Sequence, residues 1–378
     1  MKKIRIGLVG FGAMGKTHTY AVRNLPFFYK ELPFEAEVVA ICTAHEDTAR
    51  RAAALYGISH VMKNERELID SDLVDVIDIC SPNRYHYDAI MYALKKGKPV
   101  YCEKPLCTTY DEAKKAASLA RTQGVTAQIV FNNRYLAPMM RARELIEEGR
   151  LGRILSFRGE YLHTSAVFVE KPIGWKQDKD VCGGGVLFDL GSHVIDLIYY
   201  LCGRFESVTG VSQIAYPERI GRDGNAWKTN ADEAFYMLAK LECGAIGSIE
   251  VSKVALGTND DLKIEVRGTR GALRFSLMEP NFLEFFDGSD PEAVLGGERG
   301  YKKIECVGRY PAPGGIFPGM RAPVGWLRGH IGSMYDFLSA VCEGRTASPS
   351  FDDAAHVQWV MEEAYKSDKK GIFTREND

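Results

Sequence analysis

Residues 4–15 read Ile4-Arg5-Ile6-Gly7-Leu8-Val9-Gly10-Phe11-Gly12-Ala13-Met14-Gly15, an apolar run that passes directly into closely spaced glycines. The apolar part predicts a buried strand, and a helical pattern follows over roughly residues 16–25. A GxGxxG motif carries weight only between a strand and a helix, and here it has both neighbours. Its glycines permit a tight turn, close backbone approach to a pyrophosphate and close helix–strand packing, while helix-terminal amides bind phosphate. The predicted dinucleotide-binding loop comprises Gly10, Phe11, Gly12, Ala13, Met14 and Gly15.

Strand and helix patterns continue to alternate through the first third of the chain. Further strands are predicted at 37–42, 74–80, 100–102 and 125–131, with helices at 46–56, 82–96 and 111–123 between them. Residues 27–34 are expected to form a packed loop. Repetition of this kind builds a parallel sheet, so we predict an α/β Rossmann domain (a doubly wound parallel sheet) over residues 1–131.

The end of the second predicted strand lacks the acidic residue that usually binds the adenosine ribose of NAD. Its place is taken by Cys42-Thr43-Ala44-His45, and two arginines follow only at positions 50 and 51. The hydroxyl of Thr43 could accept a 2′-phosphate, although no arginine stands directly beside it. Thr43 and His45 are predicted to lie beside the cofactor, and NAD and NADP both remain open.

A second informative stretch is Val100-Tyr101-Cys102-Glu103-Lys104-Pro105-Leu106. Pro105 removes a backbone donor and biases Lys104 away from helical geometry. Lys104 should therefore lie extended beyond the carboxyl end of a strand, where open α/β sheets bind ligands. Taken alone, a Lys-Pro pair is more often a solvated turn.

Composition narrows the class of protein. A chain of 378 residues, 46% apolar and 26% charged, is long enough for two globular domains. The net charge of −2 gives no electrostatic case for nucleic acid or an anionic membrane as partner. Nine cysteines without CxxC spacing favour reduced thiols over a disulfide framework or zinc knuckle, and no residue pattern supports a metal site. Because Arg5 interrupts the first apolar run, we read no signal peptide and expect a soluble, cytoplasmic protein.

From residue 132 the pattern changes. A helix is predicted at 138–148, a strand at 153–161 and a helix beginning near Asp189, followed by strand-like runs with no helices between them. Those runs span 208–216, 232–241, 245–254, 262–268, 272–276 and 282–286. Consecutive strands predict an α+β domain over 132–331 with a large, mainly antiparallel open sheet. Residues 287–329 read as a long irregular segment, and two helices are predicted at 332–344 and 351–369.

Four motifs stand in order along the chain: the glycine loop, Ser81-Pro82-Asn83 with His86, Glu103-Lys104-Pro105, and the run from Gly183-Gly184-Gly185 to Asp189 and His193. With Asn132-Asn133-Arg134-Tyr135 and the tail at 349–353, they resemble the glucose–fructose oxidoreductase, inositol dehydrogenase and rhizopine-catabolism (Gfo/Idh/MocA) family of NAD(P)-dependent oxidoreductases. The resemblance covers nearly the whole chain. It does not fix the substrate, because family members act on many polyols, sugars and related carbonyls.

The resemblance implies a nicotinamide beside the Glu-Lys-Pro loop and a catalytic set of Lys104, Asp189 and His193. A histidine suits a general base near neutral pH, and a lysine stabilises a developing alkoxide. Asp189 and His193 are four positions apart, so both would project to one face of a helix beginning near Asp189. We predict His193 as base, Lys104 as the group that orients the hydroxyl, and Asp189 as a substrate ligand or proton relay, with the lysine and histidine roles exchangeable. Without the resemblance, Asp189 would read as a helix cap and His193 as an ordinary helix histidine.

Other residues are placed near the site by the same resemblance. The cofactor edge would include Ser81, Pro82, Asn83, His86, Glu103, Asn132 and Arg134. The substrate pocket would include Tyr161, His163 and Trp175. Independently of the resemblance, we expect the irregular segment to fold over this pocket and to bring Trp326 or His330 near the sugar. Ordinary core packing is the competing interpretation for these residues. His18 and His86 could be either structural or functional. In relatives the C-terminal helices return to the nucleotide domain, here at 332–373, and the open sheet pairs subunits, so a homodimer or homotetramer is expected.

Three functions fit these predictions. The leading one is an NAD(P)-dependent dehydrogenase of a secondary hydroxyl on a sugar, inositol or related polyol. The second is an enzyme that retains its cofactor and processes glycosides by transient oxidation, elimination and re-reduction, or a keto-sugar reductase. The third is a non-catalytic nucleotide-binding regulator, since fold does not fix function.

Overall fold

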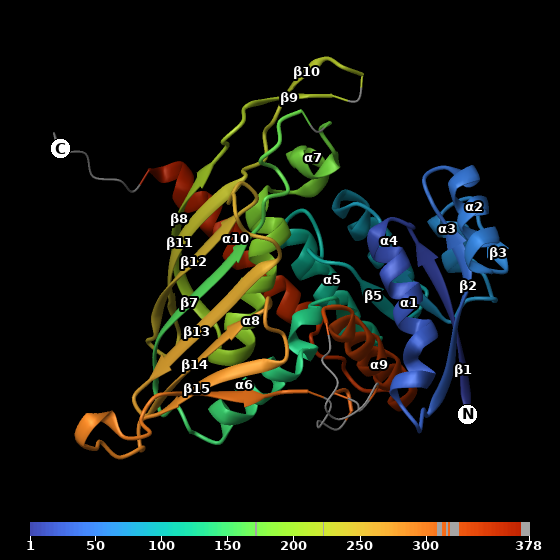
Figure 1. The fold of residues 1–378 in the computed structure, drawn as a ribbon. Helices are drawn as coiled ribbons and strands as arrows, with labels where there is room; N and C mark the ends of the chain where they lie inside the picture. Colours follow the sequence, from blue (N-terminus) through green and yellow to red (C-terminus); the bar gives the residue numbers. More distant parts are fainter. Residues whose placement is uncertain (171, 222, 308–311, 315–316, 318–324, 372–378) are drawn as a thin grey trace. The chain divides into compact units, whose positions relative to one another are not determined.

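We describe the chain from a computed structural model in which residues 1–170, 172–221, 223–307, 312–314, 317 and 325–371 are described (Figure 1). The chain divides into two compact units. Unit 1 comprises Met1–Tyr135 and Gly308–Ala355, and unit 2 comprises Leu136–Val307 and His356–Asp378.

Unit 1 is built on a six-stranded sheet whose strands are all parallel. The strand order is β3-β2-β1-β4-β5-β6, the doubly wound order in which ligands bind beyond the carboxyl ends of the strands. The predicted Rossmann sheet is therefore confirmed. The strands are β1 (Lys2–Val9), β2 (Phe34–Cys42), β3 (His60–Val61), β4 (Val76–Ile79), β5 (Val100–Cys102) and β6 (Ala127–Ile129). The helices are α1 (Ala13–Phe28), α2 (Glu46–Tyr56), α3 (Glu65–Asp70), α4 (His86–Lys95), α5 (Tyr110–Gln123) and α9 (Leu327–Glu343).

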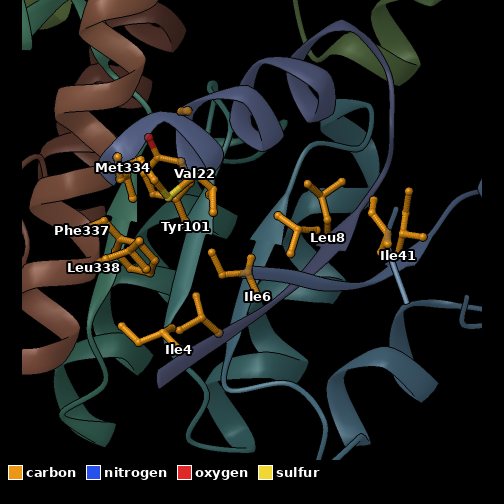
Figure 2. Close-up of a cluster of buried hydrophobic side chains, with 14 of the residues drawn as sticks. Ile4, Ile6, Leu8, Val22, Ile41, Tyr101, Met334, Phe337 and Leu338 are labelled. Atoms are coloured by element: carbon orange, nitrogen blue, oxygen red, sulfur yellow. The ribbon is translucent and has the colours of Figure 1, made fainter. Parts of the chain in front are cut away.

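The core of unit 1 lies between its sheet and helices α1 and α9 (Figure 2). Strand β1 contributes Ile4, Ile6 and Leu8, none of them more than 1% exposed. From α9, which is more than 300 residues later in the chain than β1, come Met334, Phe337 and Leu338. Burying an aliphatic or aromatic side chain of this size stabilises a fold by roughly 1.5–3 kcal/mol, so α9 is an integral part of unit 1.

Several local expectations for unit 1 were wrong in detail. Helix α1 continues through Pro26 to Phe28, so the predicted packed loop begins later; Phe28 packs against the core, and this burial outweighs the proline. The pair β3 and α3 was missed because two-residue strands and six-residue helices carry little periodicity. The helix predicted at 82–96 is split into a 3₁₀ turn, Asn83–Tyr85, and α4.

Unit 2 contains an eight-stranded sheet in the order β16-β15-β14-β13-β7-β12-β11-β8. All neighbouring pairs are antiparallel except β7 and β12, which are parallel, so the prediction of a mainly antiparallel sheet is confirmed. The strands are β7 (Ile154–Leu162), β8 (Phe205–Gln213), β11 (Ala234–Leu241), β12 (Ile246–Ser252), β13 (Asp261–Gly268), β14 (Gly271–Ser276), β15 (Phe282–Asp287) and β16 (Tyr301–Glu305). The sequence missed the exposed edge strand β16, which lies in the predicted irregular segment, and the small hairpin of β9 (Glu218–Ile220) and β10 (Ala226–Lys228).

The helices of unit 2 are α6 (Ala137–Glu147), α7 (Lys179–Cys182), α8 (Ser192–Cys202) and α10 (Phe351–Lys370). Along β11 the residues alternate between buried and exposed, so one face of the sheet is packed and the other is open. The stretch Lys179–Cys202 is long and apolar enough to cross a membrane by length and composition, but 78% of its apolar window is buried inside the protein. It is a core segment that packs on β7.

The unit boundaries differ from those drawn from the sequence. Residues 132–135 and 308–331, which were assigned to the second domain, fall in unit 1. Helix α9 lies in unit 1, whereas α10 belongs to unit 2 from His356 onward. The His356 ring stacks on Trp359 of the same helix and accepts a hydrogen bond from the backbone N–H of Phe205. This hydrogen bond anchors α10 beside β8.

Candidate functional site

The glycine loop after β1 has the backbone geometry that a pyrophosphate site requires. Gly10 has φ +90°, and a Cβ there would lie 2.8 Å from the backbone of Cys80. A Cβ on Gly15 would lie 2.7 Å from the carbonyl oxygen of Gly10. At Gly12, the residue that precedes α1, an added Cβ meets no described atom within 4 Å. Gly10 and Gly15 thus close the turn, while the open space at Gly12 and the start of α1 fit a phosphate group.

The rim of this loop holds the other residues predicted for the cofactor. Ala13 and Met14 open α1, and Phe11 packs against Tyr56 with ring centroids 5.1 Å apart. Ser81 and Pro82 follow β4, and the Ser81 hydroxyl is buried without a hydrogen-bond partner among the described residues. An unsatisfied buried hydroxyl beside the glycine loop fits a site that a polar ligand completes.

Among the described residues at the end of β2, the side chains that could bind a 2′-phosphate are engaged in local contacts. The Thr43 hydroxyl donates to the carbonyl of His45 at 2.7 Å, so it is already engaged, and His45 is exposed at the start of α2. Arg50, a candidate phosphate ligand, donates through Nε to Glu46 Oε1 at 2.9 Å. This local pairing favours NAD over NADP.

His86 is a buried link between two loops of unit 1. Its Nδ1 lies 3.0 Å from the carbonyl oxygen of Pro105 and its Nε2 lies 2.7 Å from that of Ser81. Burial lowers the pKa of His86. The ring therefore joins the loop after β4 to the Glu-Lys-Pro loop after β5, and Asn83, also buried, lies at the start of the same segment.

The Glu-Lys-Pro loop ends β5 on a buried acid and a half-buried lysine. Glu103 accepts a hydrogen bond from His18 Nε2 at 3.1 Å, and its other oxygen accepts one from the backbone N–H of Lys104, also at 3.1 Å. Burial would raise the pKa of Glu103, but the hydrogen bond and charge of His18, with the charge of Lys104, lower it to about 2. Glu103 is thus ionised, and Lys104 lies at the carboxyl edge of the sheet, as the sequence predicted.

His330 and Trp326 belong to unit 1, at the start of α9. Their rings meet edge to face with centroids 4.3 Å apart. His330 is 2% exposed, and neither ring nitrogen has a hydrogen-bond partner among the described residues. Burial, together with the positive charge of His18, lowers the pKa of His330 to about 3, so its imidazole is neutral.

Asn132 and Arg134 lie in a buried 3₁₀ turn, Asn132–Tyr135, that packs against α9. Arg134 forms an ion pair of 3.6 Å with Asp353 of the tail motif. A Cβ on Gly329 would lie 2.6 Å from the carbonyl oxygen of Asn132, which explains the glycine at this crossing. Within unit 1, Asn132 packs against α9, and Arg134 pairs with the first turn of α10.

In unit 2, Asp189 is held between two lysines. Its carboxylate accepts hydrogen bonds from Lys176 Nζ at 2.8 and 3.0 Å, and Lys253 Nζ lies 3.0 Å away. Asp189 lies in a π-helical turn, Leu187–Gly191, that runs directly into α8 at Ser192, so the expected helix near Asp189 is confirmed, with a π turn at its start. His193, half-buried, stands in the first turn of α8.

The three glycines before this turn have a steric cause. Gly183 has φ +83°, and a Cβ on Gly185 would lie 2.2–2.4 Å from the backbone and carboxylate of Asp232. Asp232 Oδ1 accepts from the N–H of Gly185 at 3.1 Å and from the Tyr365 hydroxyl. Burial raises the pKa of Asp232. This contact fixes the segment that carries Asp189 to α10.

Tyr161 and His163, predicted for the substrate pocket, share a carboxylate. The Tyr161 hydroxyl donates to Asp260 Oδ1 at 2.6 Å, and His163 Nε2 lies 2.8 Å from the same oxygen. The Tyr161 ring meets the His193 ring at a centroid distance of 5.9 Å. Burial and the nearby charge of Asp260 raise the pKa of Tyr161, which therefore stays a neutral donor. Trp175 is 40% exposed, and Lys176 Nζ lies 5.7 Å from its ring centroid.

Four polar residues that contact the predicted segments of unit 2 were not predicted from the sequence: Lys176, Lys253, Asp232 and Asp260. Only Lys253 left a signal. It follows Ile249 and Val251 at alternate positions on the buried side, where an apolar residue is expected. A buried lysine in register with core residues requires a charged partner, which here is Asp189.

Comparisons with known proteins agree with this geometry. Residues 4–131 match the model of the oxidoreductase family with NAD-binding Rossmann fold, and residues 139–274 match the GFO/IDH/MocA C-terminal domain. Levoglucosan dehydrogenase of Pseudarthrobacter phenanthrenivorans is 30% identical over 98% of this chain and 97% of its own length. D-glucoside 3-dehydrogenase of Escherichia coli is 30% identical over 65% of this chain and 66% of its own. A solved structure of levoglucosan dehydrogenase in complex with NADH and levoglucosan has a TM-score of 0.93 and 31% identity, with 98% of each chain covered.

The chain belongs to the Gfo/Idh/MocA family of oxidoreductases. It is an NAD-dependent oxidoreductase of the class that acts on CH–OH groups, within a family of sugar and polyol dehydrogenases. The resemblance read from its motifs is thereby confirmed, and of the two cofactors left open by the sequence, NAD is the one supported. The open space at Gly12 and the orphaned Ser81 hydroxyl fit this cofactor.

Proposed function

We propose that this protein oxidises a secondary hydroxyl of a glycoside or anhydrosugar, with Lys104, Asp189 and His193 as its catalytic set. The main support is the near-full-length likeness to a dehydrogenase structure that holds NADH and levoglucosan. The name of the second relative, a D-glucoside 3-dehydrogenase, supports a ring hydroxyl at the 3-position of a sugar as the reacting group. Tyr161, His163 and Asp260 supply donors and an acceptor suited to neighbouring sugar hydroxyls.

Each residue of the catalytic set has a role that follows from the chemistry of its side chain. NAD, when bound, accepts the hydride from the carbinol carbon. The imidazole of His193 takes the hydroxyl proton, because its ordinary pKa suits a base near neutrality. The ammonium of Lys104 orients the hydroxyl and stabilises negative charge on its oxygen. Asp189, fixed between Lys176 and Lys253, is a poor proton acceptor and serves to hold the sugar and these cations in place.

The test is turnover of a sugar panel with NAD. Levoglucosan and methyl glucosides should be oxidised, and His193→Asn should lower kcat by about a hundredfold or more, the usual contribution of a general base. Unchanged kcat in His193→Asn would contradict the role of His193. If Lys104→Met instead abolishes the acid limb of the pH profile and His193→Asn does not, the roles of lysine and histidine are exchanged.

A second candidate uses the same residues with a retained cofactor, in transient oxidation, elimination and re-reduction of a glycoside. It is distinguished by purifying the protein without nucleotide, denaturing it and identifying what is released. Near-stoichiometric NAD supports retention, and an empty protein supports exchange. An empty protein that oxidises no sugar would favour the non-catalytic regulator. We place the reaction in the cytoplasm, where the nine cysteines, all free in the described structure, remain reduced.

We further propose that the open face of the unit 2 sheet pairs two copies of the chain in a dimer or tetramer. Tyr236, Leu238 and Ile246 on neighbouring strands are 48%, 62% and 62% exposed. Together with Ser248 and Glu250, the first two line a hollow of about 650 Å³ on this face. An apolar patch of this kind on a soluble chain is typical of an interface. Light scattering should show a dimer or larger species that Leu238→Asp dissociates, and a monomeric wild-type chain would contradict the proposal.

A further inference from the structure

His18 of α1 is a buried histidine that the catalytic set does not use. Its side chain is 1% exposed, and it contacts one acid in β4 and one acid in the loop after β5. Nδ1 lies 2.9 and 3.1 Å from the two carboxylate oxygens of Asp78 in β4, and Nε2 lies 3.1 Å from Glu103 after β5. An ionised carboxylate can only accept a hydrogen bond, and its charge attracts a positive ring, so acids at both nitrogens favour donation from both, that is, an imidazolium.

The surroundings of His18 favour this charge. The groups that face it are Asp78 and Cys80 at the end of β4, Tyr101 and Glu103 of the β5 segment, and neutral His330 of α9. Burial alone would lower the pKa of His18, but the charge and hydrogen bond of Asp78 outweigh it, and the pKa is raised well above its ordinary value. Burial raises the pKa of the Cys80 thiol, which stays neutral. His18 is thus the fixed cation between two buried carboxylates.

We propose that His18 is a positioning residue, a permanent imidazolium that fixes the Glu103 carboxylate and, through it, the backbone from which Lys104 projects. The link is direct, because Glu103 accepts from His18 with one oxygen and from the Lys104 N–H with the other. An uncharged residue at position 18 leaves Glu103 buried without its cation, and such a carboxylate either takes up a proton or moves. The catalytic consequence rests on the proposed function, since it requires that Lys104 acts on the substrate.

A metal ion is the competing occupant of this cluster. The ligand atoms of His18, Glu103 and His330 lie within 4.8 Å of one another, and the same is true of His18, Asp78 and Cys80. A metal-bound imidazole must, however, present a deprotonated nitrogen to the ion. The protonation state of His18 therefore decides between an ion-pair cluster and a metal site.

The first test is the nitrogen NMR spectrum of the ¹⁵N-histidine-labelled protein as purified. The chain has eight histidines, so the His18 signals are assigned by their loss in His18→Asn. Both ring nitrogens of His18 should remain protonated from about pH 6 to about pH 9, well above the ordinary histidine pKa of roughly 6.5. A deprotonated nitrogen in that range would overturn the proposal, whether from a neutral ring or a bound metal. This measurement requires no substrate, so its failure is separate from failure of the dehydrogenase assignment.

The second test is the kinetics of His18→Asn and His18→Gln, with the exposed His60→Asn as matched control. Both His18 variants should lower kcat by about tenfold or more with a smaller change in KM, as expected when a transition-state contact is misplaced. Their pH profiles should also show an additional ionisation on the acid side, because Glu103 now titrates, and Glu103→Gln in the same background should remove that ionisation. NADH binding, measured by fluorescence, reports the conformation of the Glu-Lys-Pro loop and does not require turnover. A folded His18→Asn with wild-type kcat and pH profile would refute the positioning role. If His18→Asn does not fold, His18→Gln supplies both the NMR assignment and the kinetic comparison.

Discussion

Replacing Gly12 by alanine should separate cofactor binding from folding. Gly12 has φ −82°, outside the left-handed region that disfavours side chains, and its added Cβ meets no described atom within 4 Å. Alanine is a poorer residue than glycine before a helix, but it lowers the entropy of the unfolded chain. These effects oppose each other, and we expect the free energy of unfolding to change by less than about 1 kcal/mol.

The same methyl group occupies the space in which a pyrophosphate would approach the backbone. Loss of that approach should weaken NADH binding by at least tenfold, which corresponds to about 1.4 kcal/mol. Gly10→Ala is the matched contrast. There the Cβ would lie 2.8 Å from the backbone of Cys80 at φ +90°, so overpacking and backbone strain should destabilise unit 1 by about 1–3 kcal/mol.

The assay combines urea unfolding with fluorescence titration of NADH for wild type, Gly12→Ala and Gly10→Ala. We expect Gly12→Ala to unfold at the same urea concentration as wild type but to bind NADH weakly. Gly10→Ala should unfold at a lower urea concentration and should also bind NADH weakly. Wild-type NADH affinity in a fully folded Gly12→Ala would refute the placement of the pyrophosphate at this loop.

Three further predictions concern residues behind the site. Lys253→Met should lower kcat by about tenfold and leave NADH affinity unchanged, because Asp189 loses one of its two cations. The control is Lys240→Met, at an exposed position on β11. An equal loss of kcat in both variants would contradict the role of Lys253. In urea unfolding, Tyr365→Phe should lower the free energy of unfolding by about 1 kcal/mol and Asp232→Asn by about 1–3 kcal/mol. The double variant should lower it by less than the sum of the two, because the two side chains share one hydrogen bond. Strict additivity would argue against this contact. The pKa of Glu103, about 2, lies below its ordinary value of 4.5, so its contribution of up to about 3 kcal/mol is present above pH 4.5 and is lost as pH falls toward 2. Between about pH 6 and pH 3, Glu103→Gln should therefore lose less stability than wild type, and the exposed Glu35→Gln should follow wild type.

The elements that sequence predicted well are those with strong local signals. Helix α2 was placed at its observed bounds because acids stand in its first turn and Gly57, at φ +60°, ends it. Strand β5 was also placed correctly, between Pro99 and the Glu-Lys-Pro motif. By contrast, edge strand β16 carries exposed lysines and shows no apolar alternation, so its pairing with β15 was not visible.

The candidate site shows the same division. The glycine loop, Lys104, Asp189 and His193 were named from short motifs. Their partners were not, because the contacts join distant positions. His18 is 60 residues from Asp78 and 85 from Glu103, and Asp232 is 47 from Gly185. Charge pairing over such distances follows from strand order and register, which a single sequence does not display. The assignment of α10 to unit 2 depends on packing of the same kind.

The central claim is that Lys104 acts on a sugar hydroxyl in an NAD-dependent oxidation. The most direct test is formation of NADH from NAD and levoglucosan or a methyl glucoside by wild type and Lys104→Met, with NADH binding measured in parallel. Our account predicts that wild type produces NADH and that Lys104→Met binds NADH but turns over at least about a hundredfold more slowly. Turnover by Lys104→Met at the wild-type rate would contradict it.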